Sequence, residues 1–397
     1  MKIRNLVYLA QIEEYDSQRV FNWLKNNPKK EVIEIKKKLV LTPKTIVILF
    51  LTHIFSLLFI PEKSIYFALK SFYPIDYLLK FILVFLAKLK IRIFHPKLIT
   101  IGITGSWGKT TTKETLWNIF NHKYITEKTF DNQNTLIGVS LKILKLPINT
   151  QIFVCEMGAY QAGDIKKLCQ LTKPKVSIIT AIGPMHLERF GTIQNIIKTK
   201  FEIIDTLSND SYGFIPRLLK KDLKHQNLSK KIFYFDTISD TYLKIGKIFN
   251  VSSSIVNKMI ENPPIIKHRH QVIDNGIIKL IDNSYNSNPA SFRKSADILY
   301  EQKTKVRIII TPGMVELGHL ASKENYQAAL YASKKCTHAI IVGKTNKKAL
   351  TKGFHKLAKN KIFFVKSFKE VDEILQEIII PKNTSVLIEN DLPDNYF

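Results

Sequence analysis

The sequence predicts an α/β protein of two doubly wound domains that follow a helical, basic N-terminal segment. From Leu98 onward, short apolar runs rich in β-branched residues alternate with helix-like stretches, a pattern typical of βαβ units and parallel sheets. The chain has 397 residues, enough for two or three domains. Residues 1–97 instead show helical spacing of apolar positions and long apolar runs.

Composition limits the class of protein. Hydrophobic residues make up 45% and charged residues 23%, which is ordinary for a globular protein and excludes both wholesale disorder and a polytopic membrane protein. The three cysteines (Cys155, Cys169 and Cys336) have no CxxC spacing and cannot form a disulfide framework. A reduced, cytoplasmic compartment is therefore expected.

The charge is unusually positive. Lys and Arg number 60 and Asp and Glu 33, which gives a net charge of +27. Such a balance favours nucleic acid, an anionic membrane surface or phosphorylated substrates as partners. AT-rich coding produces the same Lys-, Ile- and Asn-rich composition, and the lysines are spread along the chain. Charge is the only sign of nucleic acid, so no nucleic-acid partner is expected.

Two apolar runs stand out in the N-terminal segment. Thr45 to Ile60 contains no charged residue and is bracketed by Pro43 and Pro61, but its 16 residues fall short of the roughly 20 that span a bilayer. Tyr77 to Ala87 contains one charged residue, Lys80. Basic residues flank the pair on both sides: Lys36, Lys37, Lys38, Lys44, Lys88, Lys90 and Arg92.

This arrangement predicts association with the cytoplasmic face of a membrane through residues 43–92, as a short hairpin or an interfacial anchor. The anionic membrane surface would then be a partner of the chain. A buried helical pair in a soluble domain is the alternative.

Seven apolar runs are expected to form strands: Leu98–Ile103, Ile152–Cys155, Val176–Thr180, Ile277–Ile281, Val306–Ile310, Ala339–Val342 and Val386–Ile388. Pro263-Pro264 suggests a domain boundary. We therefore expect a helical segment at 1–97, a central ATP-binding domain at 98–265 and a C-terminal Rossmann-like domain at 266–397.

The sharpest local signal is the run Gly105-Ser106-Trp107-Gly108-Lys109-Thr110-Thr111, between a predicted strand and a predicted helix at Thr111–Phe120. Glycines allow backbone N–H groups to surround phosphate oxygens, and the helix N-terminus adds a partial positive charge. Lys109 is expected to reach the β- and γ-phosphates of ATP, and the Thr110 hydroxyl to bind Mg²⁺.

The run departs from the generic G-x-x-x-x-G-K-[ST] spacing, because Ile103 stands where the first glycine belongs. It reads T-G-S-x-G-K-T-T. Its place between strand and helix still predicts a P-loop ATPase domain.

Glu156 ends an apolar strand and is followed closely by Gly158. A carboxylate at the carboxyl edge of a parallel sheet faces the ligand crevice, where it can bind Mg²⁺ beside the phosphate loop. A surface glutamate at the end of a strand is the alternative.

From the phosphate loop to about residue 350 the sequence resembles the Mur ligases, ATP-dependent amide ligases of peptidoglycan precursor synthesis. The segments that carry the resemblance follow in order: Asn134–Val139, Glu156–Ala159, Ile182–Glu188, Lys200, Arg269, Asp282–Pro289 and Pro312–Gly318. Their E-M-G-A, S-Y-N-x-N-P and M-x-E-L-G patterns are most similar to the branch that adds D-alanyl-D-alanine to a UDP-N-acetylmuramoyl-tripeptide.

The resemblance implies roles for individual residues. It implies that Glu156 and His186 bind Mg²⁺ and that Lys200 is a carbamylated, anionic metal ligand, with Lys198 nearby as the residue that could be confused with it. Arg269 would stabilise charge on the transferring phosphoryl group. ATP would be bound by Gly105, Ser106, Gly108, Lys109, Thr110, Thr111, Asn134, Asn283, Tyr285, Asn286 and Asn288. The implied reaction proceeds through an acyl-phosphate.

Three departures from the family pattern affect the substrate. The family begins with a domain for the UDP-sugar, which residues 1–97 do not resemble. His268 replaces a glycine before Arg269, and Leu387–Pro393 replaces a basic K-G-S-R-like segment. A lipid-linked precursor or a γ-linked polyglutamate therefore remains an alternative acceptor, and a non-catalytic nucleotide-binding anchor is the alternative from another class.

Overall fold

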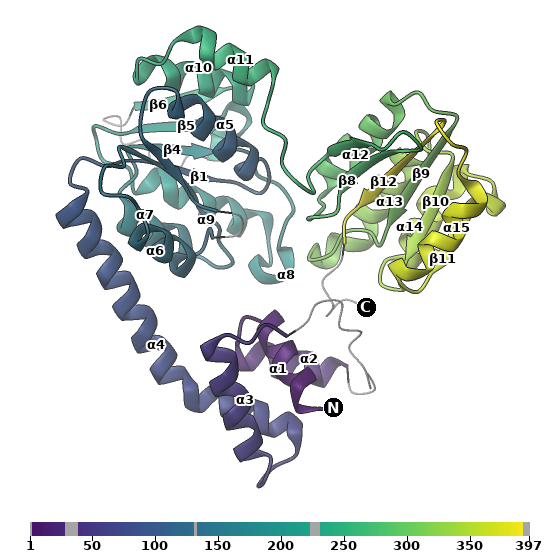
Figure 1. Cartoon of the computed structure of the whole chain (residues 1–397), viewed down its shortest axis with the longest axis horizontal. Coiled ribbons are helices and arrows are strands. Elements are labelled where there is room, and N and C mark those ends of the chain that lie inside the picture. Colours follow the sequence, from purple (N-terminus) through teal and green to yellow (C-terminus); the bar gives the residue numbers. More distant parts are fainter. Residues whose placement is uncertain (1, 28–38, 131–132, 223–230, 392–397) are drawn as a thin grey trace.

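The computed structural model describes residues 2–27, 39–130, 133–222 and 231–391, which form three parts along the chain (Figure 1). Lys36, Lys37 and Lys38, and Leu392 and Pro393 at the other end, lie outside these residues. The first part is helical: α1 (Ile3–Ile12), α2 (Ser17–Asn26), α3 (Pro43–Phe55) and α4 (Pro61–Phe94). Pro43 and Pro61 begin α3 and α4, where a missing N–H is tolerated.

The second part contains a parallel sheet of six strands in the order β2-β3-β1-β4-β5-β6. Its strands are β1 (Ile99–Thr104), β2 (Thr126–Lys128), β3 (Ile152–Glu156), β4 (Val176–Ile179), β5 (Tyr212–Pro216) and β6 (Lys231–Phe235). Its helices are α5 (Lys109–Asn121), α6 (Leu136–Leu144), α7 (Asp164–Thr172), α8 (Leu187–Phe190), α9 (Ile193–Asp205), α10 (Ile238–Ile248) and α11 (Ser253–Glu261).

The third part contains a second sheet of six strands, in the order β11-β10-β9-β12-β8-β7. Only the edge strand β7 runs antiparallel, against β8. The strands are β7 (Gln271–Asp274), β8 (Lys279–Asn283), β9 (Val306–Thr311), β10 (His338–Val342), β11 (Ile362–Val365) and β12 (Thr384–Glu389). The helices are α12 (Pro289–Glu301), α13 (Ala321–Ala332), α14 (Lys347–Gly353) and α15 (Val371–Ile378).

Each sheet has an apolar core on both faces. In the first sheet the neighbouring residues Phe153 and Val154 belong to different buried clusters, because successive side chains of a strand point to opposite faces. In the second sheet the neighbouring residues Ile308 and Ile309 likewise belong to different buried clusters. The predicted α/β class with parallel sheets is therefore confirmed.

All seven predicted strands form, with ends shifted by at most two residues. Five strands were not predicted: β2, β5, β6, β7 and β11. Four of these lie at a sheet edge, and β5 lies next to one. β2 and β7 are short and contain polar or charged residues, so they lack the continuous apolar runs of central strands. β6 and β11 do carry apolar runs, I-F-Y-F and I-F-F-V, and were missed although that signal was present.

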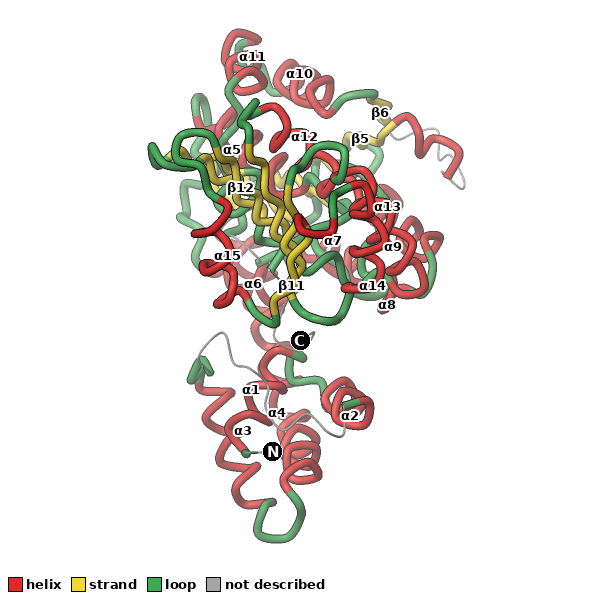
Figure 2. Tube along the Cα trace, turned by 90° about the vertical axis from the view of Figure 1, so that its right-hand side faces the viewer, coloured by secondary structure: helices red, strands yellow, loops and turns green. Residues whose placement is uncertain are grey.

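Helix α4 joins the helical part to the first sheet domain (Figures 1 and 2). Its beginning packs on α1, α2 and α3. Its end packs on α6, where Ala87 is buried and Lys90 Nζ donates to the carbonyl oxygens of Leu144 and Leu146, each at 2.8 Å. The two apolar runs therefore belong to α3 and to the middle of α4. Within the described residues, no helix combines the length and apolarity needed to cross a membrane.

The three cysteines are free and buried. Burial raises the pKa of the Cys155 thiol well above its ordinary value, and the pKa values of Cys169 and Cys336 to about 12. The expectation of no disulfide framework therefore agrees with the structure.

Candidate active site

The phosphate loop occupies the turn between β1 and α5. Gly108 has a φ of 81° and caps α5, which begins at Lys109. Gly105 has a φ of 150°, and a Cβ there would lie 2.1 Å from Thr180 Oγ1. Only glycine fits such a conformation with so little space.

A segment after β4 fixes the loop. The Ser106 hydroxyl donates to the Gly183 carbonyl at 3.0 Å and accepts from the Gly183 N–H at 3.1 Å. The Ser106 N–H donates to the Ala181 carbonyl at 2.7 Å. These bonds tie the turn after β1 to the turn after β4, at the carboxyl edge of neighbouring strands.

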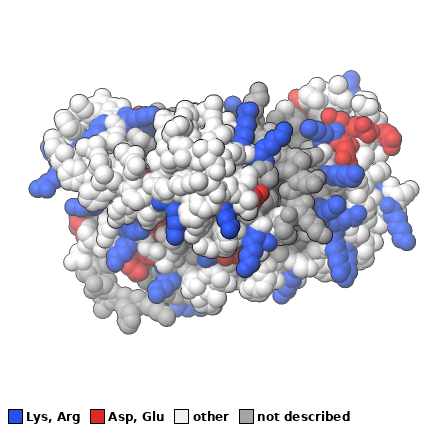
Figure 3. All heavy atoms as spheres, turned by 90° about the horizontal axis from the view of Figure 1, so that it is seen from below, with Lys and Arg blue, Asp and Glu red and all other residues white. Residues whose placement is uncertain are grey.

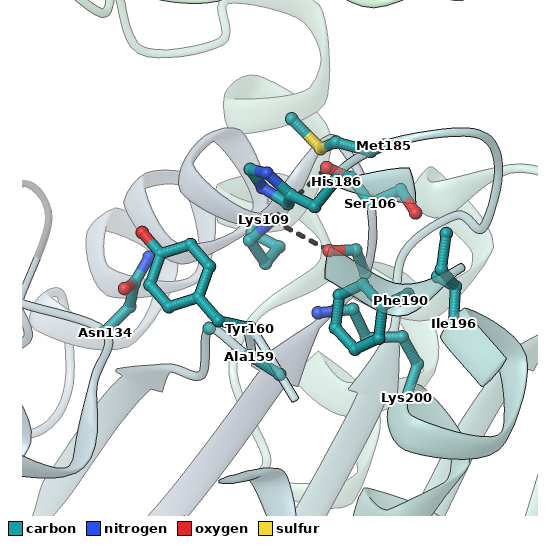
Figure 4. Close-up of a pocket in the computed structure, with 12 residues that line it drawn as sticks. Ser106, Lys109, Asn134, Ala159, Tyr160, Met185, His186, Phe190, Ile196 and Lys200 are labelled. Carbon is teal, nitrogen blue, oxygen red and sulfur yellow. Dashed lines mark hydrogen bonds between the residues drawn. The ribbon is translucent and has the colours of Figure 1, made fainter. Parts of the chain in front are cut away.

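Lys109 extends over this loop. Its Nζ donates to the carbonyl oxygens of Gly105 at 2.7 Å and Ser106 at 3.3 Å (Figure 4). Burial lowers the pKa of Lys109, Glu156 opposes this change, and Arg269 lowers the pKa further. Arg269 of the second sheet domain is therefore within electrostatic reach of the loop.

The Glu156 carboxylate is held from three directions. Thr110 Oγ1 donates to Oε2 at 3.0 Å, and Asn134 Nδ2 donates to Oε1 at 3.1 Å. Lys113 Nζ, whose residue is 1% exposed, lies 3.6 Å from Oε2. The structure thus brings together Thr110, Glu156 and Asn134, which the sequence analysis selected, and adds Lys113, which it did not.

A pocket opens beside the loop. Lys109 and Lys200 converge on it from α5 and α9, with Tyr160 and Asn134 on one side and Phe190 and Ile196 on the other (Figure 4). Its lining is completed by Gly105, Ser106, Gly158, Ala159, Met185 and His186. A glycine loop and two lysine amines in one partly enclosed pocket suit a ligand that carries several negative charges.

His186 lies at this pocket but is paired with a residue of the second sheet domain. Its Nδ1 contacts Glu316 Oε2, and the Glu188 N–H donates to the Glu316 carbonyl at 3.4 Å. Burial is the largest single influence on the pKa of the Glu316 carboxyl and raises it, but the hydrogen bond from His186 and the nearby charges of His186, Arg189 and Arg19 together lower the pKa below its ordinary value. His186 and Glu156, which the family pattern pairs at one metal, are not in contact here. The contact between His186 and Glu316 instead connects the two sheet domains.

Lys200 is 4% exposed and lies on α9 facing the pocket, whereas Lys198 is exposed on the same helix. Burial and the positive charge of Lys109 together lower the pKa of Lys200 to about 7, against the opposing effect of nearby carboxylates. A lysine with such a pKa has a substantial neutral fraction at neutral pH, and the neutral amine is a nucleophile. Of the two lysines, Lys200 has the environment that carbamylation requires.

The lowered pKa of Lys200 predicts how stability depends on pH. The unfolded chain holds a proton on this amine up to a pH of about 10.4. Between pH 7 and that value the unfolded state binds more protons, so stability rises with pH. We expect Lys200→Met to remove this part of the slope of the unfolding free energy, measured in urea at pH 7, 8 and 9 without bicarbonate. Lys198→Met is the control and should keep the wild-type slope; equal slopes in all three proteins would contradict the prediction.

The second sheet domain supplies Arg269 and the Asn-rich turn after β8. The Arg269 guanidinium lies 4.2 Å from the centre of the Tyr285 ring, which is exposed. Asn283 is buried, and its Nδ2 donates to Ser291 Oγ at 3.1 Å and Glu389 Oε2 at 2.9 Å.

Two further asparagines of this turn make local hydrogen bonds. Asn288 Oδ1 caps α12 by accepting from the N–H groups of Ala290 and Ser291, and Asn286 Oδ1 accepts from the Ser287 N–H at 2.8 Å. Asn283 and Asn288 thus shape the turn, while Tyr285 lies at its surface beside Arg269. Thr111, the remaining predicted loop residue, is exposed on α5.

His268, which stands where the family pattern has glycine, adopts a backbone conformation that favours glycine. Its φ is 61°, a left-handed value that few residues other than glycine adopt. Its Nδ1 lies 2.7 Å from Asp282 Oδ2. The substitution therefore places an imidazole in contact with a carboxylate next to Arg269.

Glu389 is a buried carboxyl at the end of β12 that the sequence analysis did not select. It accepts from Asn283 and from Ser287 Oγ. Burial raises its pKa to about 7, although these hydrogen bonds oppose the change. Glu389 lies in the segment where the family pattern has basic residues, and its hydrogen bonds with Asn283 and Ser287 stabilise the Asn-rich turn. The only signal in the sequence was this departure from the family pattern.

The residues present fit an ATP site with magnesium. Among the described residues, no three His, Cys, Asp or Glu side chains converge on one point. Mg²⁺ uses few protein ligands and prefers oxygen, and it takes its remaining ligands from phosphates and water. The Glu156 carboxylate and the Thr110 hydroxyl beside the phosphate loop supply that kind of donor.

Comparison with known proteins gives a family for the middle of the chain. The model of the Mur ligase middle domain matches residues 103–261. The UDP-N-acetylmuramoyl-tripeptide–D-alanyl-D-alanine ligase of Rickettsia prowazekii is 26% identical over 327 residues, which cover 70% of this chain and 71% of that protein. The enzyme of the same name from Borreliella burgdorferi is 30% identical over 269 residues, 56% of this chain and 57% of that protein.

Solved structures show the same fold. MurF from Acinetobacter baumannii has a TM-score of 0.69 at 22% identity and covers 78% of this chain and 77% of that one. MurF ligase from Thermotoga maritima in complex with ADP has a TM-score of 0.67 at 21% identity, covering 79% and 80%. At these identities the likeness concerns the fold alone.

Proposed function

We propose that this chain, whose residues 103–261 are a Mur ligase middle domain, is an ATP-dependent amide ligase that adds D-alanyl-D-alanine to a UDP-N-acetylmuramoyl-tripeptide or a related peptidoglycan precursor. One observation carries the proposal. A glycine loop with Lys109 and the buried Lys200 line one pocket, and the Glu156–Thr110 pair is hydrogen-bonded to Asn134 of its lining. The second sheet domain contributes Glu316, which contacts His186 at this pocket.

Activation of the carboxylate is the first step. A carboxylate oxygen of the precursor attacks the γ-phosphorus of ATP, the bond to the β,γ-bridging oxygen breaks, and ADP leaves. Loop N–H groups and Lys109 stabilise the phosphate charge, and Arg269 balances charge on the transferring group. Gly105, Ser106, Gly108, Thr110 and Thr111 surround the phosphates, Asn134 lies near the γ-phosphate, and the turn of Asn283, Tyr285, Asn286 and Asn288 faces the nucleoside.

Amide formation is the second step. The amine of D-alanyl-D-alanine attacks the acyl-phosphate carbon and loses a proton, and inorganic phosphate leaves with the broken C–O bond. The contact between His186 and Glu316 holds the two sheet domains together over this reaction, and such closure excludes water that would hydrolyse the intermediate.

Mg²⁺ would be held by Glu156 and Thr110, with His186 and a carbamylated Lys200 as further ligands, and would neutralise charge on the phosphates. The neutral amine of Lys200 suits carbamylation, which turns the side chain into an anion. We set the boundaries between the three domains at 97/98 and 265/266. In this proposal the helical domain lies at the cytoplasmic face of a membrane.

The helical part is the reason to keep a second acceptor class. Four helices stand where the family pattern begins with a domain for the UDP-sugar. This favours a lipid-linked precursor over a soluble nucleotide as the alternative substrate, and a γ-linked polyglutamate is a further one. The presence of Lys109 in the glycine loop, together with the hydrogen-bonded pair of Glu156 and Thr110, argues against a non-catalytic nucleotide-binding anchor.

The test is phosphate release from ATP and Mg²⁺ by the purified full chain. UDP-N-acetylmuramoyl-tripeptide is supplied with and without D-alanyl-D-alanine, and the product is identified by mass. We expect release that needs both substrates and a pentapeptide product. ATP binding without turnover on this pair would overturn the proposed substrates, and turnover on a lipid-linked precursor would replace them.

A further inference from the structure

The turn between α3 and α4 exposes a group of large apolar side chains. Leu57 is 83% exposed and Leu58 is 77% exposed, and Ile60 follows them at the start of α4. Phe50 and Ile54 continue the group along α3, where their spacing of four residues places both on one side of the helix. We call these five residues the tip surface. Contiguous apolar patches of this kind mark interaction sites.

The side chains in the middle of α4 are exposed to solvent around the helix, and we call residues 77–82 the bare stretch of α4. Five consecutive or near-consecutive large apolar residues are exposed there: Tyr77, Leu78, Leu79, Phe81 and Ile82. A helix that is apolar all round is normally covered. No described element of the chain covers this stretch, which lies between the contacts of α4 with α3 and those with α6.

Basic side chains accompany these apolar residues. Residues 43–97 contain eight Lys or Arg and two Asp or Glu. Lys63 and Lys70 are exposed on the first turns of α4, and Asp76 is already paired with Lys44 at 2.8 Å and Lys80 at 2.7 Å. Viewed from below, the centre of this face is largely free of charged side chains and is surrounded by Lys and Arg (Figure 3).

We propose that the tip surface and the bare stretch of α4 dock onto an anionic lipid bilayer, with the apolar side chains among the acyl chains and the lysines at the headgroups. Leu, Ile and Phe gain free energy on leaving water, and each lysine near an anionic surface adds about 1 kcal/mol. The helices lie at the interface. This deepens the membrane location of the proposed function and names its residues and its lipid class.

Charge decides between a bilayer and a second copy of the chain. A symmetric dimer through this face would place the same patch opposite itself, so Lys63 and Lys70 of two copies would approach each other. Like charges across an interface are unfavourable. An anionic headgroup layer meets the same lysines with complementary charge, which favours the bilayer.

The docked helices are fixed relative to the active site. Lys90 anchors the end of α4 to the carbonyl oxygens of Leu144 and Leu146 at 2.8 Å. At a second point Glu14, in the turn after α1, lies 3.8 Å from Arg189 of α8, whose guanidinium packs 4.0 Å from the ring centre of Tyr160 in the pocket. A bilayer bound at the tip therefore holds the pocket at a set height and orientation above the membrane.

Vesicle flotation of the full chain tests the proposal. The vesicles are phosphatidylcholine alone or with one third phosphatidylglycerol, at low and high salt. We expect binding to the anionic vesicles that weakens with salt. The double variant Leu57→Glu/Leu58→Glu should lower the binding constant at least about tenfold, since burial of one leucine is worth about 1.5–3 kcal/mol. Both side chains are exposed, so the fold should survive.

Leu218→Glu is the matched control, because Leu218 is 87% exposed in the first sheet domain. It should bind like the wild type. The proposal would be overturned if Leu57→Glu/Leu58→Glu bound anionic vesicles as well as Leu218→Glu does, or if the wild type did not bind them. Loss of a dimer in the double variant by sedimentation would assign the surface to a second copy instead. Ligase turnover in solution is measured in parallel, and its absence would affect the proposed reaction without changing the result for the lipid surface.

Discussion

Lys109→Met should lower kcat/KM for ATP about 10³-fold and leave the fold intact. The side chain extends over the loop carbonyls and faces the pocket, and it is the cation nearest to where the phosphates would lie. Removal of one group that stabilises transition-state charge costs about 10²–10³-fold, and the cationic groups of phosphoryl-transfer enzymes reach about 10³–10⁵-fold. Methionine fills the same volume without a charge, so packing should be preserved.

The measurement is the rate of phosphate release at varied ATP, together with the melting temperature. Lys167→Met is the control, because Lys167 is an exposed lysine on α7. It should match the wild type in both. Near-wild-type turnover of Lys109→Met would mean that the loop does not bind the reacting phosphates.

Glu156→Gln should reduce turnover about 10²–10³-fold and raise the Mg²⁺ concentration needed for half-maximal rate. The amide keeps the shape of the carboxylate but removes the negative charge between Thr110 and Lys113. Among the residues that the structure describes, Glu114 at 3.6 Å is then the one carboxylate left to Lys113, so a lower melting temperature is also expected.

A Mg²⁺ titration at saturating ATP separates the two effects. Glu127→Gln serves as the control, because Glu127 pairs with Lys142 and does not line the pocket. If Glu156→Gln lost stability but kept the wild-type Mg²⁺ dependence, Glu156 would act only as the partner of Lys113.

The central strands and the phosphate loop could be predicted because their signals are local. β1, β4 and β9 are buried on both faces and appear as short runs rich in Ile and Val, and the loop lies within seven residues. β2 has three residues and β7 is exposed over most of its length, so neither differs from a loop in its sequence. The long α4 was predicted only in part, because Asp76 and Lys80 interrupt its apolar pattern.

The partners of buried charges could not be predicted from local patterns. His186 and Glu316 are 130 residues apart, and Asn283 and Glu389 are 106 residues apart. These contacts depend on how β8 and β12 pair and on how the two sheet domains face each other. The family pattern supplied His186 and Asn283 as candidates, but only the structure shows that each is held by a carboxylate.

The burial of all three thiols has a practical consequence. Thiol-directed dyes react with exposed thiolates, whereas Cys155, Cys169 and Cys336 are inaccessible and protonated at neutral pH. Two cysteines introduced at exposed positions, one in each sheet domain, would therefore be labelled selectively without removal of the native ones. Energy transfer between the two dyes could then follow opening and closing of the domains on single molecules during turnover.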